Sequence, residues 1–353
     1  MNFRACWPMP DQLAPVRPNH RFDEAALARW MDDHVPDFRG PLSVSQFDGG
    51  QSNPTYRLRT AGRDYVLRRK PPGVLVKGAH AVDREFRVIS ALHATGFPVP
   101  APFGLCLDDA VIGTSFYVME MVEGRSFRDT AFPEVPRDER AAMFEAMNAT
   151  IARLHAIDPV AAGLGDFGRQ GNYFERQVGR WSRQYLEDPE AGRLAAMDAL
   201  IEWLPANIPA GDDCTIVHGD FRCDNMLFHP REPRVIAVLD WELSTLGHPL
   251  ADFAYHLMIY RMPPGFSTGL AGLDLPALGI PDEERYVEAY CRRTGRDGID
   301  RLDFYLAFSL FRLAAIIHGI KGRLLRGTAS SSQAELAVEQ LDRIAALALA
   351  QTR

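Results

Sequence analysis

The strongest chemical signal in the sequence is HGDFRCDN, residues 218–225, which is followed by Asp240 at the end of the apolar segment VIAVLD. Phosphoryl transfer requires a carboxylate that orients the attacking hydroxyl group and receives its proton. It also requires hard oxygen ligands that hold Mg²⁺ against the phosphates of a nucleotide. We therefore expect Asp220 to be the catalytic carboxylate, and Asn225 and Asp240 to be the metal ligands.

The spacing H-x-D-x-x-x-x-N from His218 to Asn225 is typical of kinase catalytic loops. Taken singly, Asp and Asn after a strand often only cap backbone groups, and we expect His218 to hold the loop in shape. A metallohydrolase that uses His218, Asp220, Asp240 and His248 is a competing hypothesis. It is disfavoured because the sequence contains no H-x-H or H-E-x-x-H pair.

A candidate nucleotide site lies upstream, in FDGGQSN, residues 47–53, and YVLRRK, residues 65–70. Glycine allows the backbone amides of such a loop to approach phosphates closely, although a Gly-Gly hairpin turn is the simpler explanation. One arginine of YVLRRK is expected to pair with the phosphates and Glu85 to orient it, although cations also protect edge strands. The loop residues expected to bind nucleotide are Gly49, Gly50, Ser52 and Asn53.

The elements around these residues predict an α+β fold with two lobes. Alternating segments between residues 42 and 73 predict antiparallel hairpins, and residues 80–95 predict a helix. Short strands are expected at 116–122, 215–217 and 235–239, and helices at 137–156, 173–186, 193–204, 283–293, 302–318 and 333–349. We expect an N-terminal tail over 1–20, a small sheet lobe with one helix over 21–121, and a larger, mainly helical lobe over 122–353.

Charge, cysteine spacing and apolar stretches indicate which partners and which cellular location to expect. The 353 residues carry a formal charge of −7 and no long basic run, so we expect no nucleic-acid partner. Five scattered cysteines without C-x-x-C spacing favour a reducing, cytoplasmic location. The apolar stretch 302–317 contains Asp303 and Arg312, and we expect a buried helix there and no membrane association. Oligomeric state stays open.

HGDFRCDNMLF together with VIAVLDWELSTLGHPLADFAY resembles the aminoglycoside phosphotransferase and choline kinase superfamily, whose members share the protein-kinase fold. The segments YVLRRKPPGVLVKGAHAVDREFRVISAL, NYFERQVGRWSRQYL and FRLAAIIHGIKGR resemble one branch, the kinase-like domains fused to acyl-CoA dehydrogenases. The similarity covers residues 25–330.

The resemblance implies the same roles for Asp220, Asn225 and Asp240, and it adds others. It places phosphate pairing at Arg68, with Arg69 as the open alternative one residue along the strand. It further implies an ion pair from Glu85, a nucleotide-binding hinge that includes Glu120 and Val122, structural support from Asp252, and an extra carboxylate from Glu242. The sequence departs from protein kinases in its Gly-rich loop, which lacks the full G-x-G-x-x-G pattern, and where Asp240-Trp241-Glu242 replaces Asp-Phe-Gly. Regulation by flipping of that segment is therefore not expected.

The expected function is transfer of the γ-phosphoryl group of ATP or GTP to a hydroxyl group of a small molecule. The branch resemblance suggests a hydroxylated fatty acyl group or its CoA thioester as the acceptor. The alternative is a catalytically silent nucleotide-binding or scaffold module, as pseudokinases are. Retention of Asp220, Asn225 and Asp240 argues against that alternative.

Overall fold

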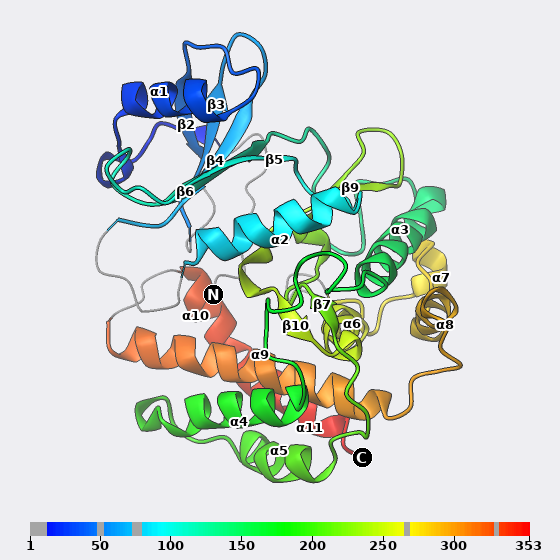
Figure 1. Ribbon diagram of the computed structural model, residues 1–353. Coiled ribbons are helices and arrows are strands. Elements are labelled where there is room, and N and C mark those ends of the chain that lie inside the picture. The colour runs from blue at the N-terminus through cyan, green and yellow to red at the C-terminus, as the bar shows by residue number, and fades with distance from the viewer. Residues whose placement is uncertain (1–12, 48–52, 73–79, 265–268, 328–331) are drawn as a thin grey trace.

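The computed structural model describes residues 13–47, 53–72, 80–264, 269–327 and 332–353. An antiparallel sheet with two helices forms a small lobe, and a larger, mainly helical lobe lies below it in Figure 1. This arrangement confirms the predicted α+β, two-lobed, protein-kinase-like fold. The prediction of one helix in the small lobe was wrong, because a second helix over residues 24–34 packs on the other face of the sheet.

The small lobe is built on a six-stranded sheet in the order β1-β2-β3-β4-β6-β5, with every neighbouring pair antiparallel. The predicted hairpins are β2–β3 and β3–β4. Residues 13–20, inside the predicted tail, contribute β1 and a short 3₁₀ helix. The strands are β1 (Leu13–Ala14), β2 (Ser43–Phe47), β3 (Thr55–Arg59), β4 (Tyr65–Arg69), β5 (Pro102–Cys106) and β6 (Phe116–Glu120).

Each face of this sheet packs against a different helix. Helix α1 (Glu24–His34) covers one face, where Leu27 and Trp30 join Tyr65 and Leu67 of β4 in one apolar cluster. On the other face, Val66 belongs to the core that contains residues of α2 (Val82–Ala94), and α2 lies between the sheet and the helical lobe (Figure 1). Because side chains alternate along a strand, β4 directs consecutive residues to opposite faces.

The larger lobe is organised around α9 (Leu302–Leu325), which packs against α4, α5, α6, α10 and α11. It extends beyond the predicted 302–318. By length and composition this helix is long enough to cross a membrane, but 83% of its most apolar window is buried inside the protein. The other helices are α3 (Arg137–His155), α4 (Tyr173–Leu186), α5 (Ala195–Ala206), α6 (Pro249–Leu257), α7 (Leu275–Leu278), α8 (Glu283–Thr294), α10 (Ser332–Glu339) and α11 (Leu341–Ala350).

Two short β-ribbons in the helical lobe flank the chemical motif. The predicted strand at 215–217 is β7 (Thr215–Val217), which pairs with β10 (Thr245–Gly247). The predicted strand at 235–239 is β9 (Val235–Val238), which pairs with β8 (Met226–Phe228). The two predicted strands therefore belong to separate ribbons, and the polar residues that follow each of them must be joined by loop contacts.

Acid should destabilise the fold through His256 of α6, which is 2% exposed. Burial lowers its pKa from 6.5 to about 4. The unfolded chain therefore binds a proton below pH 6.5 that the folded chain does not accept until about pH 4, and the free energy of unfolding falls across that window. Between pH 7.5 and pH 5, we expect His256→Gln to lose about 2 kcal/mol less stability than the wild type in urea titrations.

The matched control is His93→Gln, because His93 lies exposed on α2. This variant should keep the wild-type loss of stability on acidification. Equal acid sensitivity of His256→Gln and the wild type would show that His256 is not responsible.

Candidate active site

The loop that follows β7 is held by the carboxylate of Asp252 on α6. The backbone N–H of His218 donates to Oδ2 of Asp252 at 2.8 Å, and the N–H of Gly219 donates to Oδ1 at 2.8 Å. Gly219 has φ +83°, and a Cβ atom there would lie 2.8 Å from the carbonyl oxygen of Leu243. The loop therefore requires glycine at this point, and the contacts of Asp252 agree with the expected supporting role.

The side chain of His218 links this loop to the strand that leads into Asp240. Its Nε2 lies 2.9 Å from the carbonyl oxygen of Leu239, and its Nδ1 accepts a hydrogen bond from the N–H of Asp220 at 3.1 Å. Nε2 must therefore carry the proton. His218 acts on the shape of the loop in this structure.

These contacts disfavour the metallohydrolase hypothesis. Both ring nitrogens of His218 are engaged, and Nδ1 of His248 accepts from the N–H of Leu250 at the start of α6. Within the described ranges, no group of three or more His, Cys, Asp and Glu side chains is arranged to hold a metal ion. A zinc-type site is thus not supported by the geometry.

The carboxylate of Asp220 is accessible from solvent to the hydroxyl group of a small molecule, since its side chain is 20% exposed. Tyr255 donates to Oδ1 at 2.7 Å, and the amide of Asn225 donates to Oδ2 at 3.1 Å. Burial alone would raise the pKa of Asp220, but the nearby Arg222 guanidinium and the hydrogen bond from Tyr255 outweigh it, and the pKa lies below its ordinary value. The group is therefore an ionised carboxylate at neutral pH.

Asn225 and Asp240 are brought together by a backbone contact between their segments. The N–H of Leu239, next to Asp240, donates to the carbonyl oxygen of Asn225 at 2.8 Å. The side-chain Oδ1 of Asn225 is buried and has no hydrogen-bond partner. A buried acceptor without a donor is costly, and a hard cation would satisfy it. The two predicted metal ligands and Asp220 thus lie in one region.

A buried cation joins the two lobes at this region. Arg68 of β4 lies 2.8 Å from Glu85 of α2, 2.9 Å from Asp240 and 3.5 Å from Glu242, counted between side-chain nitrogen and oxygen atoms. Its side chain is 1% exposed. Nη1 of Arg68 is buried without a hydrogen-bond partner. One cation against three carboxylates leaves an excess of negative charge, which a divalent cation would offset.

Arg69 lies on the opposite face of β4. It donates to the carbonyl oxygens of His20 and Ile112 at 3.1 and 3.3 Å, and it stacks 5.0 Å from the ring centroid of Phe22. Of the two arginines that the sequence leaves as candidates, Arg68 is therefore the one that faces Glu85 and Asp240.

Glu85 is fixed by donors from three elements. Besides Arg68, it accepts from the amide of Asn53 at 2.7 Å and from the hydroxyl group of Tyr117 at 3.0 Å. Burial raises the pKa of Glu85, and Arg68 opposes this rise. The amide oxygen of Asn53 lies 3.1 Å from Nδ1 of His80, so the Asn53 side chain is engaged with protein groups. Gly49, Gly50 and Ser52 lie outside the described residues.

The expected hinge follows β6. The side chain of Glu120 is exposed and accepts from the N–H of Ala101 at 3.1 Å, so its carboxylate is directed to β5. The N–H of Val122 makes no hydrogen bond to another backbone group in the described part of the chain. A free backbone donor at this position suits the expected contact with a nucleotide base.

Sequence reasoning gave no role to Tyr255 or to Arg222. Tyr255 is recognisable in hindsight, because it lies three residues after Asp252 on α6 and so shares its helix face. Arg222 pairs with Asp224 and lies 3.7 Å from Asp220. Its guanidinium stabilises the ionised form of that carboxylate.

Comparison with known proteins gives a consistent result. The family model described as "Phosphotransferase enzyme family" matches residues 43–305. A Ralstonia eutropha protein, provisionally named an aminoglycoside phosphotransferase, has a crystal structure with a TM-score of 0.87 and 50% identity, covering 94% of this chain and 98% of that one. A thermostable mutant of the aminoglycoside phosphotransferase APH(4)-Ia, in ternary complex with AMP-PNP and hygromycin B, shares the fold with a TM-score of 0.57 at 18% identity, covering 91% of this chain and 98% of that one.

Among curated proteins, mouse "Acyl-CoA dehydrogenase family member 10" is 44% identical over 337 residues, which are 95% of this chain and 31% of the relative. The Arabidopsis thaliana protein "Probable acyl-CoA dehydrogenase IBR3" is 44% identical over 92% of this chain and 42% of its own length. The chain thus spans less than half of these relatives. It belongs to the phosphotransferase enzyme family, in the branch whose kinase-like domains accompany acyl-CoA dehydrogenases.

Proposed function

We propose that this chain is a magnesium-dependent kinase that transfers the γ-phosphoryl group of ATP or GTP to a hydroxyl group of a small molecule. The observation that carries the proposal is the convergence of Asp220, Asn225 and Asp240 beside the buried Arg68–Glu85 pair. A carboxylate with access to solvent, an unsatisfied oxygen ligand and a buried phosphate-pairing cation are the components that this reaction needs.

Asp220 acts on the acceptor. It accepts a hydrogen bond from the attacking hydroxyl group and so aims the oxygen at the γ-phosphorus. As the new O–P bond forms, the bond from that phosphorus to the bridging oxygen breaks and the nucleoside diphosphate leaves. The hydroxyl proton passes to Asp220. Arg222 and Tyr255 keep this carboxylate ionised and oriented before the acceptor arrives.

Asn225 and Asp240 would hold Mg²⁺. The ion, when bound, neutralises charge on the phosphates of the nucleotide. Arg68 would add a donor to the phosphates through Nη1, which has no protein partner, while Glu85 fixes its position. The backbone at Glu120 and Val122 would bind the base, and the loop that contains Gly49, Gly50 and Ser52 would cover the phosphates.

We assign a hydroxylated acyl group, as the free acid or the CoA thioester, to the acceptor. The support is the relatives' names, which refer to acyl-CoA dehydrogenases, and the match covers less than half of those longer proteins. A cytoplasmic location without a nucleic-acid or membrane partner fits the composition. A screen of hydroxyacyl-CoA, hydroxy acid, aminoglycoside and choline acceptors, read by nucleoside diphosphate release, tests the assignment.

Replacing the catalytic carboxylate by its neutral isostere, Asp220→Asn, should lower turnover by roughly 10²–10⁴-fold, because the hydroxyl proton loses its acceptor. Affinity for the Mg-nucleotide, measured with a fluorescent analogue, should stay close to the wild-type value. Unchanged turnover in this variant would refute the proposal. Tight nucleotide binding by the wild type without turnover on any acceptor would favour the silent pseudokinase module.

A paired replacement can separate the proposed phosphate contact of Arg68 from its contribution to the stability of the fold. Arg68→Met alone leaves Glu85 buried without its cation, which destabilises the fold by about 3–5 kcal/mol. Arg68→Met/Glu85→Leu removes both charges and should fold better, as circular dichroism and thermal melts will show. We still expect it to bind ATP or GTP about 100-fold more weakly. Wild-type nucleotide affinity in the folded double variant would exclude a phosphate contact.

Tyr255→Phe tests whether Tyr255 lowers the pKa of the proposed catalytic carboxylate, Asp220. The change removes a hydrogen bond that lowers the pKa of Asp220, so that pKa should rise. The acid limb of the pH profile of kcat/KM should therefore move to higher pH, since the reaction needs the ionised form. Tyr260→Phe is the matched control, because Tyr260 donates to the carbonyl oxygen of Pro281. An unmoved limb in Tyr255→Phe would contradict this role.

A further inference from the structure

Arg312 of α9 places a positive charge beside the catalytic loop. Its Nη2 donates to the carbonyl oxygen of Gly219 at 2.8 Å, one residue before Asp220. Its guanidinium carbon lies 5.1 Å from the ring centroid of Tyr255. The side chain is half-buried, and it makes no ion pair with a carboxylate among the described residues. A protein cation at this depth usually has an anionic partner.

Trp181 of α4 connects Arg312 to a second arginine. The guanidinium carbon of Arg312 lies 5.9 Å from the centroid of the indole, and that of Arg180 lies 5.0 Å from it. Trp181 is 7% exposed, and its Nε1–H is buried without a hydrogen-bond acceptor. Buried indole N–H groups normally have a partner. Three donor groups thus lie near one another. Among the described residues the indole N–H has no acceptor and neither arginine has an ion-pair partner, although the charge of Arg312 also helps to lower the pKa of Asp220.

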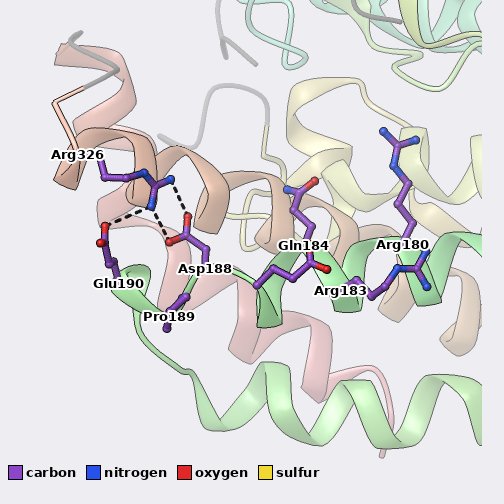
Figure 2. A pocket seen from close by; sticks show the side chains of 8 residues that line it. Arg180, Arg183, Gln184, Asp188, Pro189, Glu190 and Arg326 are labelled. Atoms are coloured by element: carbon purple, nitrogen blue, oxygen red, sulfur yellow. Dashed lines mark hydrogen bonds and ion pairs between the residues drawn. The ribbon is translucent and has the colours of Figure 1, made fainter. Parts of the chain in front are cut away.

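Of these three residues, Arg180 also lines a surface cavity of about 570 Å³ beside α4 and the end of α9. Figure 2 shows Arg326 bound by Asp188 and Glu190, whereas no dashed line reaches Arg180 or Arg183. Neither of these two has an ion-pair partner in the described ranges. Over the whole lining, three arginines are balanced by three carboxylates, but the two carboxylates of Asp188 and Glu190 are engaged by Arg326. The lining residues are Arg180, Arg183, Gln184, Glu187, Asp188, Pro189, Glu190 and Arg326.

Solvated arginines on a helix face are common, and exposure alone would explain Arg180 and Arg183. Two features do not fit that explanation: the half-buried charge of Arg312 next to the catalytic loop, and the buried indole N–H without a partner. An oxyanion that reached these groups would accept hydrogen bonds from them and neutralise guanidinium charge.

We infer that Arg312, Trp181 and Arg180 form an anion-binding site that selects acceptors with a carboxylate or phosphate group. The inference rests on the proposed function, because it assigns the acceptor side of the same active site. The ligand class is a hydroxylated organic anion, and a polycationic acceptor is repelled by the same charges. A carboxylate on the acceptor itself and the phosphates of a thioester carrier are the two sources of that charge.

Binding of unreactive probes tests the site without relying on turnover. We would titrate the full chain with hexanoate, methyl hexanoate and hexanoyl-CoA by calorimetry. At least one of the two anions should bind about 10-fold more tightly than the neutral ester, and added KCl should weaken it. Hexanoate binding identifies a carboxylate as the source, and binding of hexanoyl-CoA alone identifies phosphate. Equal affinity for the ester, or no anion binding, overturns the inference.

Variants connect this binding to the named residues. Arg312→Met and Arg180→Gln should each weaken the anion by about 10-fold and leave the ester unchanged. Arg292→Gln on α8 removes one positive charge from a side chain that is 70% exposed, and it should bind as the wild type does. Unchanged anion affinity in both test variants overturns the assignment to these residues.

Turnover assays then separate the two proposals. If 3-hydroxyhexanoate, its CoA thioester and the other screened acceptors are never phosphorylated, the proposed kinase function fails while charge-dependent binding stands. If they are phosphorylated and KM is unaffected by Arg312→Met and Arg180→Gln, the anion site fails while the kinase function stands.

Discussion

The active site depends on the buried cation Arg68, which makes ion pairs with carboxylates from both lobes. Arg68 comes from the sheet, Glu85 from α2 and Asp240 from the helical lobe, and all three side chains are almost fully buried. Removing such charges from water costs several kcal/mol per ion, so the arrangement is tolerable only while every partner is present. The relative position of the lobes is therefore coupled to the position of a predicted metal ligand. Binding of phosphate and metal at this point would act on both lobes together.

Within the helical lobe, hydrogen bonds to backbone groups fix the position of Asp220 relative to Asp240. Asp252 holds the N–H groups of His218 and Gly219, and His218 in turn contacts the carbonyl oxygen of Leu239. These contacts join two ribbons that are not paired with each other. The chain has little β-structure in this lobe, and the loop contacts replace the continuous sheet that would otherwise align Asp220 with Asp240.

Much of the fold and of the candidate site could be predicted from the sequence, because the patterns that indicate them are local. The H-x-D-x-x-x-x-N spacing places Asp220 and Asn225 in one loop, and strand alternation predicts that Arg68 and Arg69 face opposite sides. Strands β1, β5, β8 and β10 were not predicted, because they are short and lack a clear alternating pattern. β5 and β8 each pair with a strand nearby in the sequence through a register shift, whereas β1 and β10 pair with strands more distant in the sequence. Tyr255 and Trp181 contact the site across many residues of sequence. The spacing of Tyr255 from Asp252 gives a local indication for Tyr255, whereas no local pattern marks Trp181.

The segment after Asp240 is held in one conformation by the buried side chain of Trp241. Trp241 is 1% exposed, its indole donates to the carbonyl oxygen of Val238 at 3.0 Å, and its ring packs 4.6 Å from that of His218. Ser244 closes the turn by donating to the carbonyl oxygen of Trp241 at 2.6 Å. A buried tryptophan in this position would have to leave the core for the segment to flip, which would cost about 3 kcal/mol or more. The side of the site that carries the predicted metal ligands is thus a fixed frame. Under the proposed function, discrimination among substrates would then reside on the acceptor side, near the exposed arginines of α4 that have no ion-pair partner among the described residues.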